Sequence, residues 1–349
     1  MHTELCERVG VRFPLVQTGM GWVAGPRLVA ATCEAGGLGI LASATMTLDQ
    51  LAQAASEVRS RTSAPFGVNL RTDVADVDER IALMIETGAR VASFAQAPNA
   101  ALVSRCKEAG LFVMPTVGAR RHAEKVAEWG VDAVIAQGAE GGGHTGSVPT
   151  TLLLPQVVDA VGDRVLVLGA GGFFDGRGLV AALAYGAAGV AMGTRFLLSA
   201  ESRVPDAVKD LYLGTPVTGT VVTTKVDGAP QRVVRTELVD HLEAQSWLRA
   251  LPRSVRSAYQ FRKETGASLS SLLREGRAMK EGNELTWAQV LMAANAPVMT
   301  KAALVEGRTD VGVLPTGQVV GVLESLPPVA DIIGAVMAEA DEVLRGWSA

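Results

Sequence analysis

The chain has 349 residues, of which 48% are hydrophobic and 19% charged, with a formal net charge of −4 and a pI near 5.7. This composition suits a large buried core and excludes a disordered chain. The slightly acidic balance gives no overall attraction to nucleic acid or to an anionic membrane, so the expected partner is a small molecule.

Cysteines and targeting signals narrow the setting further. The three cysteines, Cys6, Cys33 and Cys106, are scattered singly, which argues against a disulfide framework or a zinc site. The N-terminal residues lack a basic region followed by an apolar core, and no run reaches the ~18 apolar residues of a membrane span. We therefore expect a cytoplasmic protein without a membrane span.

Short apolar runs alternate with helical stretches along the first 200 residues. The first helix is expected from about Ala24 to Ala35, and Thr47 to Gln50 has the form of a capping box that opens a helix to about Arg59. Eight apolar runs are expected to form strands: Phe13–Gln17, Leu38–Ala42, Phe66–Leu70, Val91–Ala95, Leu111–Val117, Ala133–Gln137, Val165–Gly169 and Ala188–Met192.

Strands that alternate with helices indicate parallel pairing through right-handed crossovers. Eight such units favour an α/β fold of the (β/α)₈ TIM-barrel type, with an open doubly wound sheet as the alternative. The open sheet usually carries G-x-G-x-x-G/A at a strand-to-helix turn, and residues Gly176–Ala181 match this pattern. The match lies past the expected strand end, within a helical stretch, so we interpret it as chance.

The stretch AVIAQGAEGGGHTG at 133–146 is the most unusual part of the sequence. Its apolar run ends at Gln137, and the glycines that follow suggest that backbone passes close to a ligand. His144 is thus expected on a closely folded loop at the end of a strand, where chemistry collects in such barrels. The alternative is a flexible surface loop with a solvated histidine. His122, in a charged helical stretch, is expected to be solvated.

Two further strand ends are rich in glycine: Gly171-Gly172 after the seventh expected strand, and Gly193-Thr194 after the eighth. Backbone N–H groups at a helix start can bind a phosphate, and Thr194 could add a hydroxyl. The alternative is that the glycines only tighten the turns. Because the two turns follow adjacent strands, together they favour a bound phosphate. The strand ends carry Gly, Gln and Asn where a metal site would need His and carboxylates, so no metal is expected.

Five motifs in this order resemble the nitronate monooxygenase family, formerly called 2-nitropropane dioxygenases, which also takes in FMN-dependent enoyl-acyl-carrier-protein reductases. They span essentially the whole chain: FPLVQTGMG at 13–21, GVN at 67–69, QGAEGGGHTG at 137–146, AGG at 170–172 and GTRF at 193–196. The resemblance implies a barrel that binds FMN, with NADH or NAD as a candidate electron partner. One departure is Gly141, where the monooxygenases usually have alanine.

The resemblance also implies roles for individual residues. His144 would be the active-site base or acid, which suits an imidazole that titrates near neutral pH and abstracts an acidic α-proton. Asn69 and Gln137 would hydrogen-bond the flavin edge, and a Gly-Gln pair near the end of the chain, here Gly317-Gln318, would return to the flavin. The remaining cofactor-binding residues are expected to be Thr18, Gly19 and Met20 along the ring, the loop glycines Gly142 and Gly143, and Gly171, Gly172, Gly193 and Thr194 at the phosphate.

The residues beyond the eighth strand predict an addition to the barrel. Residues 1–200 and 312–349 are expected to form the FMN-binding barrel, and 201–311 a β-hairpin and a mostly helical cap. The hairpin strands, Val217–Val222 and Arg232–Arg235, flank Asp227-Gly228, a good turn pair. Basic residues of the cap are either a solvated helical face or a site for the phosphates of a coenzyme A thioester: Arg249, Arg253, Arg256, Arg262, Lys263, Arg274, Arg277 and Lys280. A final helix is expected from Pro328 to about Trp347.

Within the family, segments 17–25, 171–178 and 285–295 are most similar to actinobacterial members of steroid catabolism. This implies a bulky hydrindane-dione acyl-CoA as substrate and hydrogen transfer at a carbon activated by a carbonyl. The alternatives are a nitronate monooxygenase, an enoyl-thioester reductase of fatty-acid type and a flavin-binding sensor without turnover. A homodimer is a candidate assembly.

Overall fold

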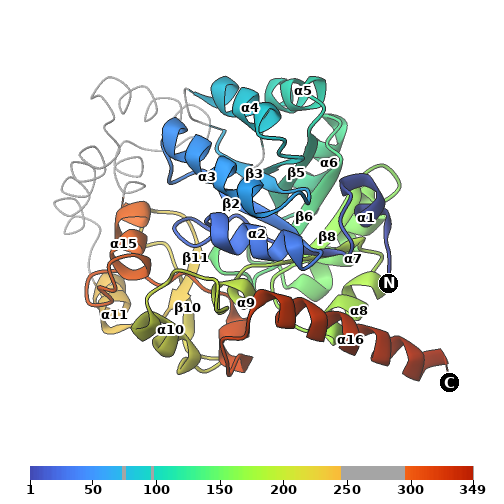
Figure 1. The fold of residues 1–349 in the computed structure, drawn as a ribbon. Helices are drawn as coiled ribbons and strands as arrows, with labels where there is room; N and C mark the ends of the chain where they lie inside the picture. The colour runs from blue at the N-terminus through green and yellow to red at the C-terminus, as the bar shows by residue number, and fades with distance from the viewer. Residues whose placement is uncertain (73–75, 96–97, 245–294, 349) are drawn as a thin grey trace.

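The computed structural model describes residues 1–72, 76–95, 98–244 and 295–348, and a closed barrel of eight parallel strands lies at its centre (Figure 1). The strands follow one another in chain order, and the last pairs with the first. They are β1 (Leu15–Gln17), β2 (Leu38–Ala42), β3 (Gly67–Leu70), β4 (Val91–Phe94), β5 (Phe112–Val117), β6 (Ala133–Gln137), β8 (Leu166–Ala170) and β9 (Gly189–Met192). All eight expected strands and the (β/α)₈ barrel are therefore confirmed.

The barrel interior is filled by apolar side chains from alternate strand positions. Val16, Ile40, Ile135 and Leu168 belong to this inner cluster. Their strand neighbours belong to a larger cluster between the sheet and the helices. Because side chains alternate across a strand, every second residue faces the barrel axis. This alternation decides which strand-end side chains face the barrel mouth.

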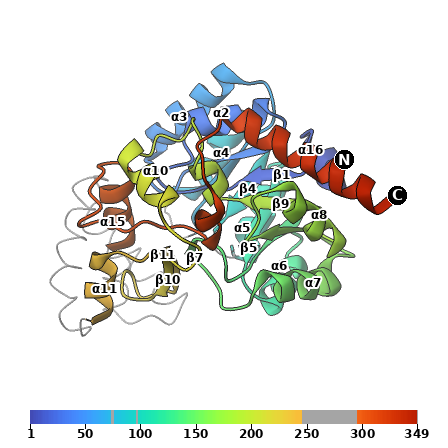
Figure 2. The ribbon, with the colours of Figure 1, turned by 90° about the horizontal axis from the view of Figure 1, so that it is seen from below.

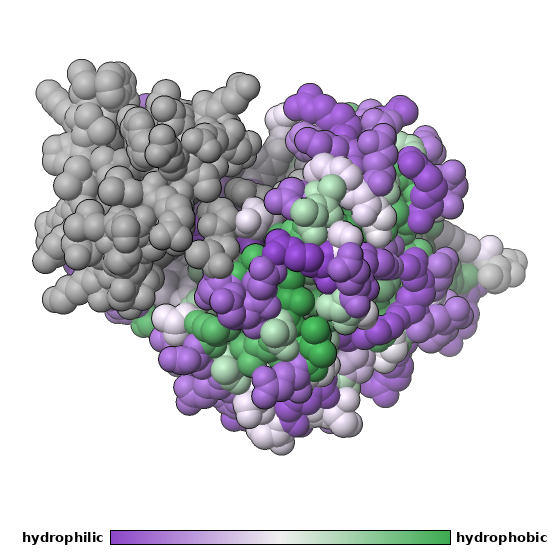
Figure 3. Space-filling model, turned by 90° about the horizontal axis from the view of Figure 1, so that it is seen from above, coloured by the Kyte–Doolittle hydropathy of each residue, from purple (hydrophilic) through white to green (hydrophobic). Residues whose placement is uncertain are grey.

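Helices cover the barrel, and Figure 3 shows one face of the molecule, on which hydrophilic residues surround a smaller hydrophobic area. The shell consists of α1 (Glu4–Val9), α2 (Pro26–Glu34), α3 (Leu48–Arg61), α4 (Val77–Glu86), α5 (Ala100–Glu108), α6 (Arg120–Glu128), α7 (Thr150–Val161), α8 (Gly176–Ala184), α9 (Thr194–Leu197) and α16 (Val329–Ser348). The expected capping box is present at α3: Thr47 Oγ1 accepts the Gln50 N–H at 3.2 Å, and Gln50 Oε1 accepts the Thr47 N–H at 3.0 Å. The G-x-G-x-x-A match lies inside α8, as expected for a chance match.

The last helix closes the shell, as the sequence predicts. The short α9 follows β9 directly, and more than a hundred residues separate it from α16 in the sequence. On its return, α16 packs between α2 and α8 (Figure 2). A C-terminal segment therefore fills the position that a helix after β9 would take.

The segment between β9 and α16 forms an addition on one side of the barrel (Figures 1 and 2). Its described elements are α10 (Asp206–Leu213), β10 (Thr220–Thr223), β11 (Gln231–Val234), α11 (Glu237–Ala244), α15 (Asn295–Leu304) and the 3₁₀ turn η1 (Gln318–Val322). β10 and β11 form the expected antiparallel hairpin. The addition has an apolar cluster of its own: Val226, Val233, Val239, Leu242, Met299 and Val313. The division into domains stays a prediction.

The predicted hairpin strands are displaced by one to three residues, and Asp227-Gly228 lies, as predicted, in the loop that joins them, at 224–230. The basic cap residues, from Arg249 to Lys280, lie outside the described residues. The coenzyme A site that they suggest therefore stays a prediction.

Three further features concern the thiols, membrane-spanning helices and possible metal ligands. Cys6, Cys33 and Cys106 are buried free thiols. No helix in the described part of the chain is long and apolar enough to cross a membrane. Within the same residues, no group of three or more His, Cys, Asp and Glu side chains could hold a metal ion.

Candidate active site

The turn after β1 meets the ends of β3 and β9 at the carboxyl end of the barrel. A Cβ atom at Gly19 would lie 2.4 Å from Asn69 Cβ, so only glycine lets this turn pass so close to Asn69. A Cβ at Gly193 would lie 3.3 Å from Thr18 Oγ1 and 3.4 Å from Met20 Sδ. These five residues, which the sequence assigns to cofactor binding, are thus close neighbours in space.

A row of polar side chains continues along the inward face of the next strands. Asn69, Ser93, Thr116 and Gln137 lie two positions beyond residues that face the barrel interior, so they share that face. Asn69 is buried, yet its side-chain amide forms no hydrogen bond with a described residue. Buried amides are normally paired, so this one is available to a ligand. Ser93 and Thr116 were missed by the sequence analysis, although a polar residue in an apolar strand run could have signalled them.

The turns after β8 and β9 expose unpaired backbone donors. Gly171 and Gly172 have φ of +89° and +87°, a left-handed conformation that favours glycine. The N–H groups of Gly171, Gly172, Gly193 and Thr194 donate to no other described residue. Because β8 and β9 are neighbours in the barrel, these donors gather at one place, as an anion site requires.

One carboxylate lies near these turns but is already engaged. A Cβ at Gly172 would lie 3.8 Å from Glu140 Cβ. The Glu140 carboxylate accepts the Thr150 N–H at 3.0 Å and the Thr150 hydroxyl at 2.7 Å, at the N-terminus of α7. Helix N-termini stabilise negative charge, so Glu140 is fixed there by its contacts with Thr150.

The returning segment at Thr316–Gln318 closes the site from the other side. The Gly317 N–H donates to Thr194 Oγ1 at 2.9 Å, so the Thr194 hydroxyl binds this segment and its N–H is the group available to a phosphate. The Gln318 N–H donates to the Glu140 carbonyl at 3.0 Å. A Cβ at Gly142 would lie 2.4 Å from both the Gly317 nitrogen and the Thr316 carbonyl carbon. Glycine at 142 is therefore required by this backbone contact.

His144 lies in a short strand instead of the expected loop. β7 (Gly143–His144) pairs with β11, with His144 opposite Gln231. The Gln137 amide donates to the His144 carbonyl at 2.8 Å. A Cβ at Gly141 would lie 2.8 Å from Gln137 Nε2, so glycine, where the resemblance has alanine, leaves room for that amide. The sequence could not show β7, because its partner strand lies almost 90 residues away.

The His144 imidazole is paired with a carboxylate that the sequence analysis assigned only to a turn. His144 Nε2 lies 2.7 Å from Asp227 Oδ2, and the side chains are 53% and 6% exposed. The hydrogen bond to Asp227 raises the pKa of His144 above its ordinary value of about 6.5, against the smaller opposing effect of burial. His122 is exposed on α6, as expected. Its pKa is lowered by partial desolvation and by the positive charges of Arg121 and Lys125.

Comparison with known proteins identifies the family. The family model described as nitronate monooxygenase matches residues 2–339. The chain belongs to this family. It is 58% identical over 350 residues to the (3aS,4S,5R,7aS)-5-hydroxy-7a-methyl-1-oxo-octahydro-1H-indene-4-carboxyl-CoA dehydrogenase of Mycobacterium tuberculosis, covering 100% of this chain and 99% of that protein. The Rhodococcus jostii protein of the same name is 56% identical over 340 residues, covering 97% and 96%. The solved structure of FabK from Thermotoga maritima aligns with a TM-score of 0.79 and 33% identity, covering 99% of both chains.

Membership of the nitronate monooxygenase family and the similarity to these dehydrogenases show that the chain is an oxidoreductase. They confirm the resemblance on which the expected site was based. The contacts described above also bring the expected site residues together at the carboxyl end of the barrel. The role of each residue stays a prediction.

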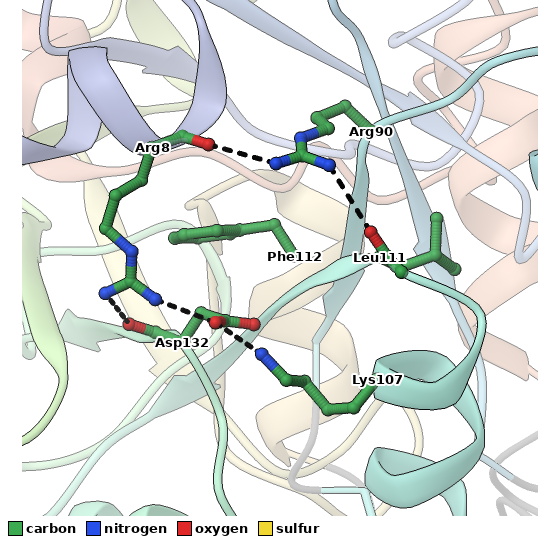
Figure 4. Close-up of a pocket in the computed structure, with 7 residues that line it drawn as sticks. Arg8, Arg90, Lys107, Leu111, Phe112 and Asp132 are labelled. Atoms are coloured by element: carbon green, nitrogen blue, oxygen red, sulfur yellow. Dashed lines mark hydrogen bonds and ion pairs between the residues drawn. The ribbon is translucent and has the colours of Figure 1, made fainter.

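A cavity of about 330 Å³ at the opposite end of the barrel has a different character (Figure 4). Asp132, just before β6, accepts from Arg8 at 2.8 Å and from Lys107 at 2.5 Å, and Arg8 lies over the Phe112 ring. Asp132 also accepts the Val113 N–H at 2.9 Å. These contacts join α1, α5 and the starts of β5 and β6. They therefore stabilise the end of the barrel that contributes to stability and not to catalysis in folds of this type.

Proposed function

We propose that this protein is an FMN-dependent dehydrogenase of a bicyclic hydroxyacyl-CoA derived from steroid C and D rings, with His144 as the residue that accepts the proton. The observation that carries this proposal is the combination of open backbone donors after β8 and β9 with the His144–Asp227 pair on the same side of the barrel.

The described residues fit a flavin mononucleotide. The N–H groups of Gly171, Gly172, Gly193 and Thr194 would hold its phosphate, since they lack other partners among the described residues. The unpaired Asn69 amide and the row that continues through Ser93, Thr116 and Gln137 offer polar groups for the edge of a flavin ring. Met20, beside Gly193, offers an apolar surface. The family match supports a flavin.

The substrate class comes from the two dehydrogenases to which the chain is 58% and 56% identical over nearly its whole length. Their name places a hydroxyl on carbon 5 of a bicyclic ring and the coenzyme A thioester on carbon 4. Removal of the hydroxyl proton and of the hydride on carbon 5 would give a ketone next to the thioester-bearing carbon. FMN, when bound, supplies a two-electron acceptor for the hydride.

The protein's own residues would supply the proton chemistry. Neutral His144 accepts the hydroxyl proton as the carbon–oxygen double bond forms, and the resulting imidazolium is stabilised by Asp227. Since Asp227 raises the pKa of His144, the residue is a competent base only above that raised value. Oxidation of the alcohol should accordingly accelerate as the pH rises through that raised pKa.

Product analysis tests the proposal. The purified protein is incubated with the hydroxyacyl-CoA and with NAD as terminal electron acceptor, and the thioester is followed by mass spectrometry. We expect a product two mass units lighter, and no change in the matched thioester that lacks the hydroxyl. Protein that purifies without flavin would contradict the proposal. Flavin-loaded protein that turns over neither the hydroxyacyl-CoA nor an alkyl nitronate would favour the sensor. Protein that leaves the hydroxyacyl-CoA unchanged while it consumes an alkyl nitronate and oxygen would favour the monooxygenase.

A further inference from the structure

The carboxylate of Asp227 is fixed by its own loop and by His144. Its Oδ1 accepts the Ala229 N–H at 3.1 Å, which leaves Oδ2 to contact the imidazole at 2.7 Å. No Lys or Arg among the described residues forms an ion pair with Asp227. A buried carboxylate without a paired cation is costly, so protonation of His144 is the local way to balance its charge.

The backbone of His144 is held from both the addition and the barrel. His144 pairs with Gln231 across the small sheet, and the Thr145 N–H donates to the Pro230 carbonyl at 3.1 Å. The Gln137 amide, at the end of β6, donates to the His144 carbonyl at 2.8 Å. The backbone is thus fixed on both sides of the residue, and the imidazole is fixed by Asp227.

The orientation of this pair distinguishes the two ring nitrogens. Nε2 faces the carboxylate, which can only accept a hydrogen bond when ionised, so the neutral imidazole carries its proton on Nε2. Nδ1 forms no hydrogen bond with a described residue. In the neutral ring, Nδ1 is therefore an unprotonated acceptor.

We propose that Asp227 is a positioning residue, which holds the Nε2–H of His144 and so makes Nδ1 the atom that exchanges a proton with the substrate. This inference rests on the proposed function, and it adds the reacting atom and the residue that selects it. Asp227 does not itself contact the substrate. Its effect is to fix the tautomer and the ring orientation.

Among the described residues, Asp227 provides the charged side chain that contacts the His144 imidazole. Arg232, on β11, donates to the Ala139 carbonyl at 2.9 Å and to Thr220 Oγ1 at 2.9 Å. Glu140, in the turn before β7, is bound to Thr150. Lys225, in the loop of Asp227, forms no ion pair with a described residue. Asp227 is consequently the charged group in contact with the imidazole, and it accounts for the direction in which the pKa of His144 is shifted.

Histidine ¹⁵N NMR of the flavin-loaded protein tests the tautomer without turnover. The chain has four histidines, and loss of one signal in His144→Gln assigns the one of interest. We expect the neutral ring to carry its proton on Nε2 and to titrate above pH 6.5, the ordinary value. A neutral ring protonated on Nδ1, or one that titrates at or below 6.5, would overturn the proposal. The variant serves only to assign the signal, and the tautomer and the titration are measured on the wild-type protein.

Asp227→Asn tests the consequence for the reaction. Asparagine keeps the shape but can donate as well as accept, so both tautomers become accessible and the pKa of His144 falls. We expect the low-pH limb of flavin reduction by the hydroxyacyl-CoA to move to lower pH, with a maximal rate reduced, though by less than the ~10²–10⁴-fold of a lost general base. The matched control is Asp240→Asn, because Asp240 pairs with Arg235 on the surface and should change neither the limb nor the spectrum.

The two readouts separate the possible failures. If the NMR result holds but Asp227→Asn leaves the pH limb and the maximal rate unchanged, Asp227 has only a structural role and the inference is wrong. If the wild-type flavin does not react with the hydroxyacyl-CoA at all, the proposed function fails, and the assignment of Nδ1 as the reacting atom fails with it. The spectrum then still reports whether Asp227 holds Nε2.

Discussion

Gly142 and Gly143 are adjacent in the sequence but have different surroundings. Replacing each of them with alanine therefore compares the effect of one added methyl group in two environments. A Cβ at Gly142 would lie 2.4 Å from the Gly317 nitrogen, 2.4 Å from the Thr316 carbonyl carbon and 2.8 Å from Thr316 Cα. All three atoms are backbone, so the change Gly142→Ala must push two main-chain segments apart. Gly143 has φ of +65° and nothing within 4 Å of its Cβ position, so Gly143→Ala meets strain but no obstacle.

The magnitudes follow from what each change disturbs. Separating the segments weakens the hydrogen bonds from Gln318 to Glu140 and from Gly317 to Thr194, at about 1 kcal/mol each. Overpacking adds about 1–3 kcal/mol, so the free energy of unfolding should fall by about 3–5 kcal/mol in Gly142→Ala. Gly143→Ala should cost about 1–2 kcal/mol, the usual penalty for a left-handed residue with a side chain.

Urea unfolding and flavin content, measured on both variants, check this comparison. Gly142→Ala should be the less stable of the two and should also lose flavin, because Thr194 is held by the displaced segment. Gly143→Ala should keep its flavin. Equal destabilisation, or better flavin retention in Gly142→Ala, would show that the segment at 316–318 does not support the site as described.

Three further changes test the phosphate site, the base and its partner. Gly172→Asp should expel FMN by repulsion of its phosphate, whereas Gly334→Asp on α16, with open space around its Cβ, should retain it; stoichiometric FMN in Gly172→Asp would place the phosphate elsewhere. His144→Ala should keep FMN yet reduce it about 10²–10⁴-fold more slowly with substrate in single-turnover measurements, and unimpaired reduction at every pH would remove His144 from the mechanism. The His144–Asp227 pair should stabilise the fold fully below the unfolded-state pKa of about 6.5, and this contribution should vanish as the pH rises through the higher folded-state pKa. The melting-temperature gap between wild type and Asp227→Asn should therefore shrink from pH 6 upward, and a constant gap would contradict the pairing.

The barrel could be predicted from the sequence because its signals are local. Each strand is a short apolar run. Helices are bounded by residues such as Thr47, which caps the start of α3, and Gly36, which follows the end of α2, and the conformational preference of such residues acts within one turn. The last helix was also predictable from its own composition. Its position between α2 and α8 was predictable only because the barrel needs an eighth helix there.

The parts of the site that the sequence did not show depend on distant partners. Asp227 looked like a turn residue, since its neighbour in the sequence is glycine and its neighbour in space, His144, is 83 positions away. Gly142 was expected to lie against the cofactor, whereas the close approach of Gly317 is what excludes a side chain there. Such contacts arise from the way the addition and the C-terminal segment return to the barrel, and no local pattern encodes them.

Anaerobic rapid mixing of the purified protein with the hydroxyacyl-CoA, an alkyl nitronate and NADH, in parallel, tests the central proposal most directly. The absorbance of the flavin near its visible maximum shows which compound transfers electrons to it. We expect rapid reduction by the hydroxyacyl-CoA with formation of the ketone, and little or none by the nitronate. Rapid reduction by the nitronate, together with an unreactive thioester, would contradict the proposed function and favour a nitronate monooxygenase.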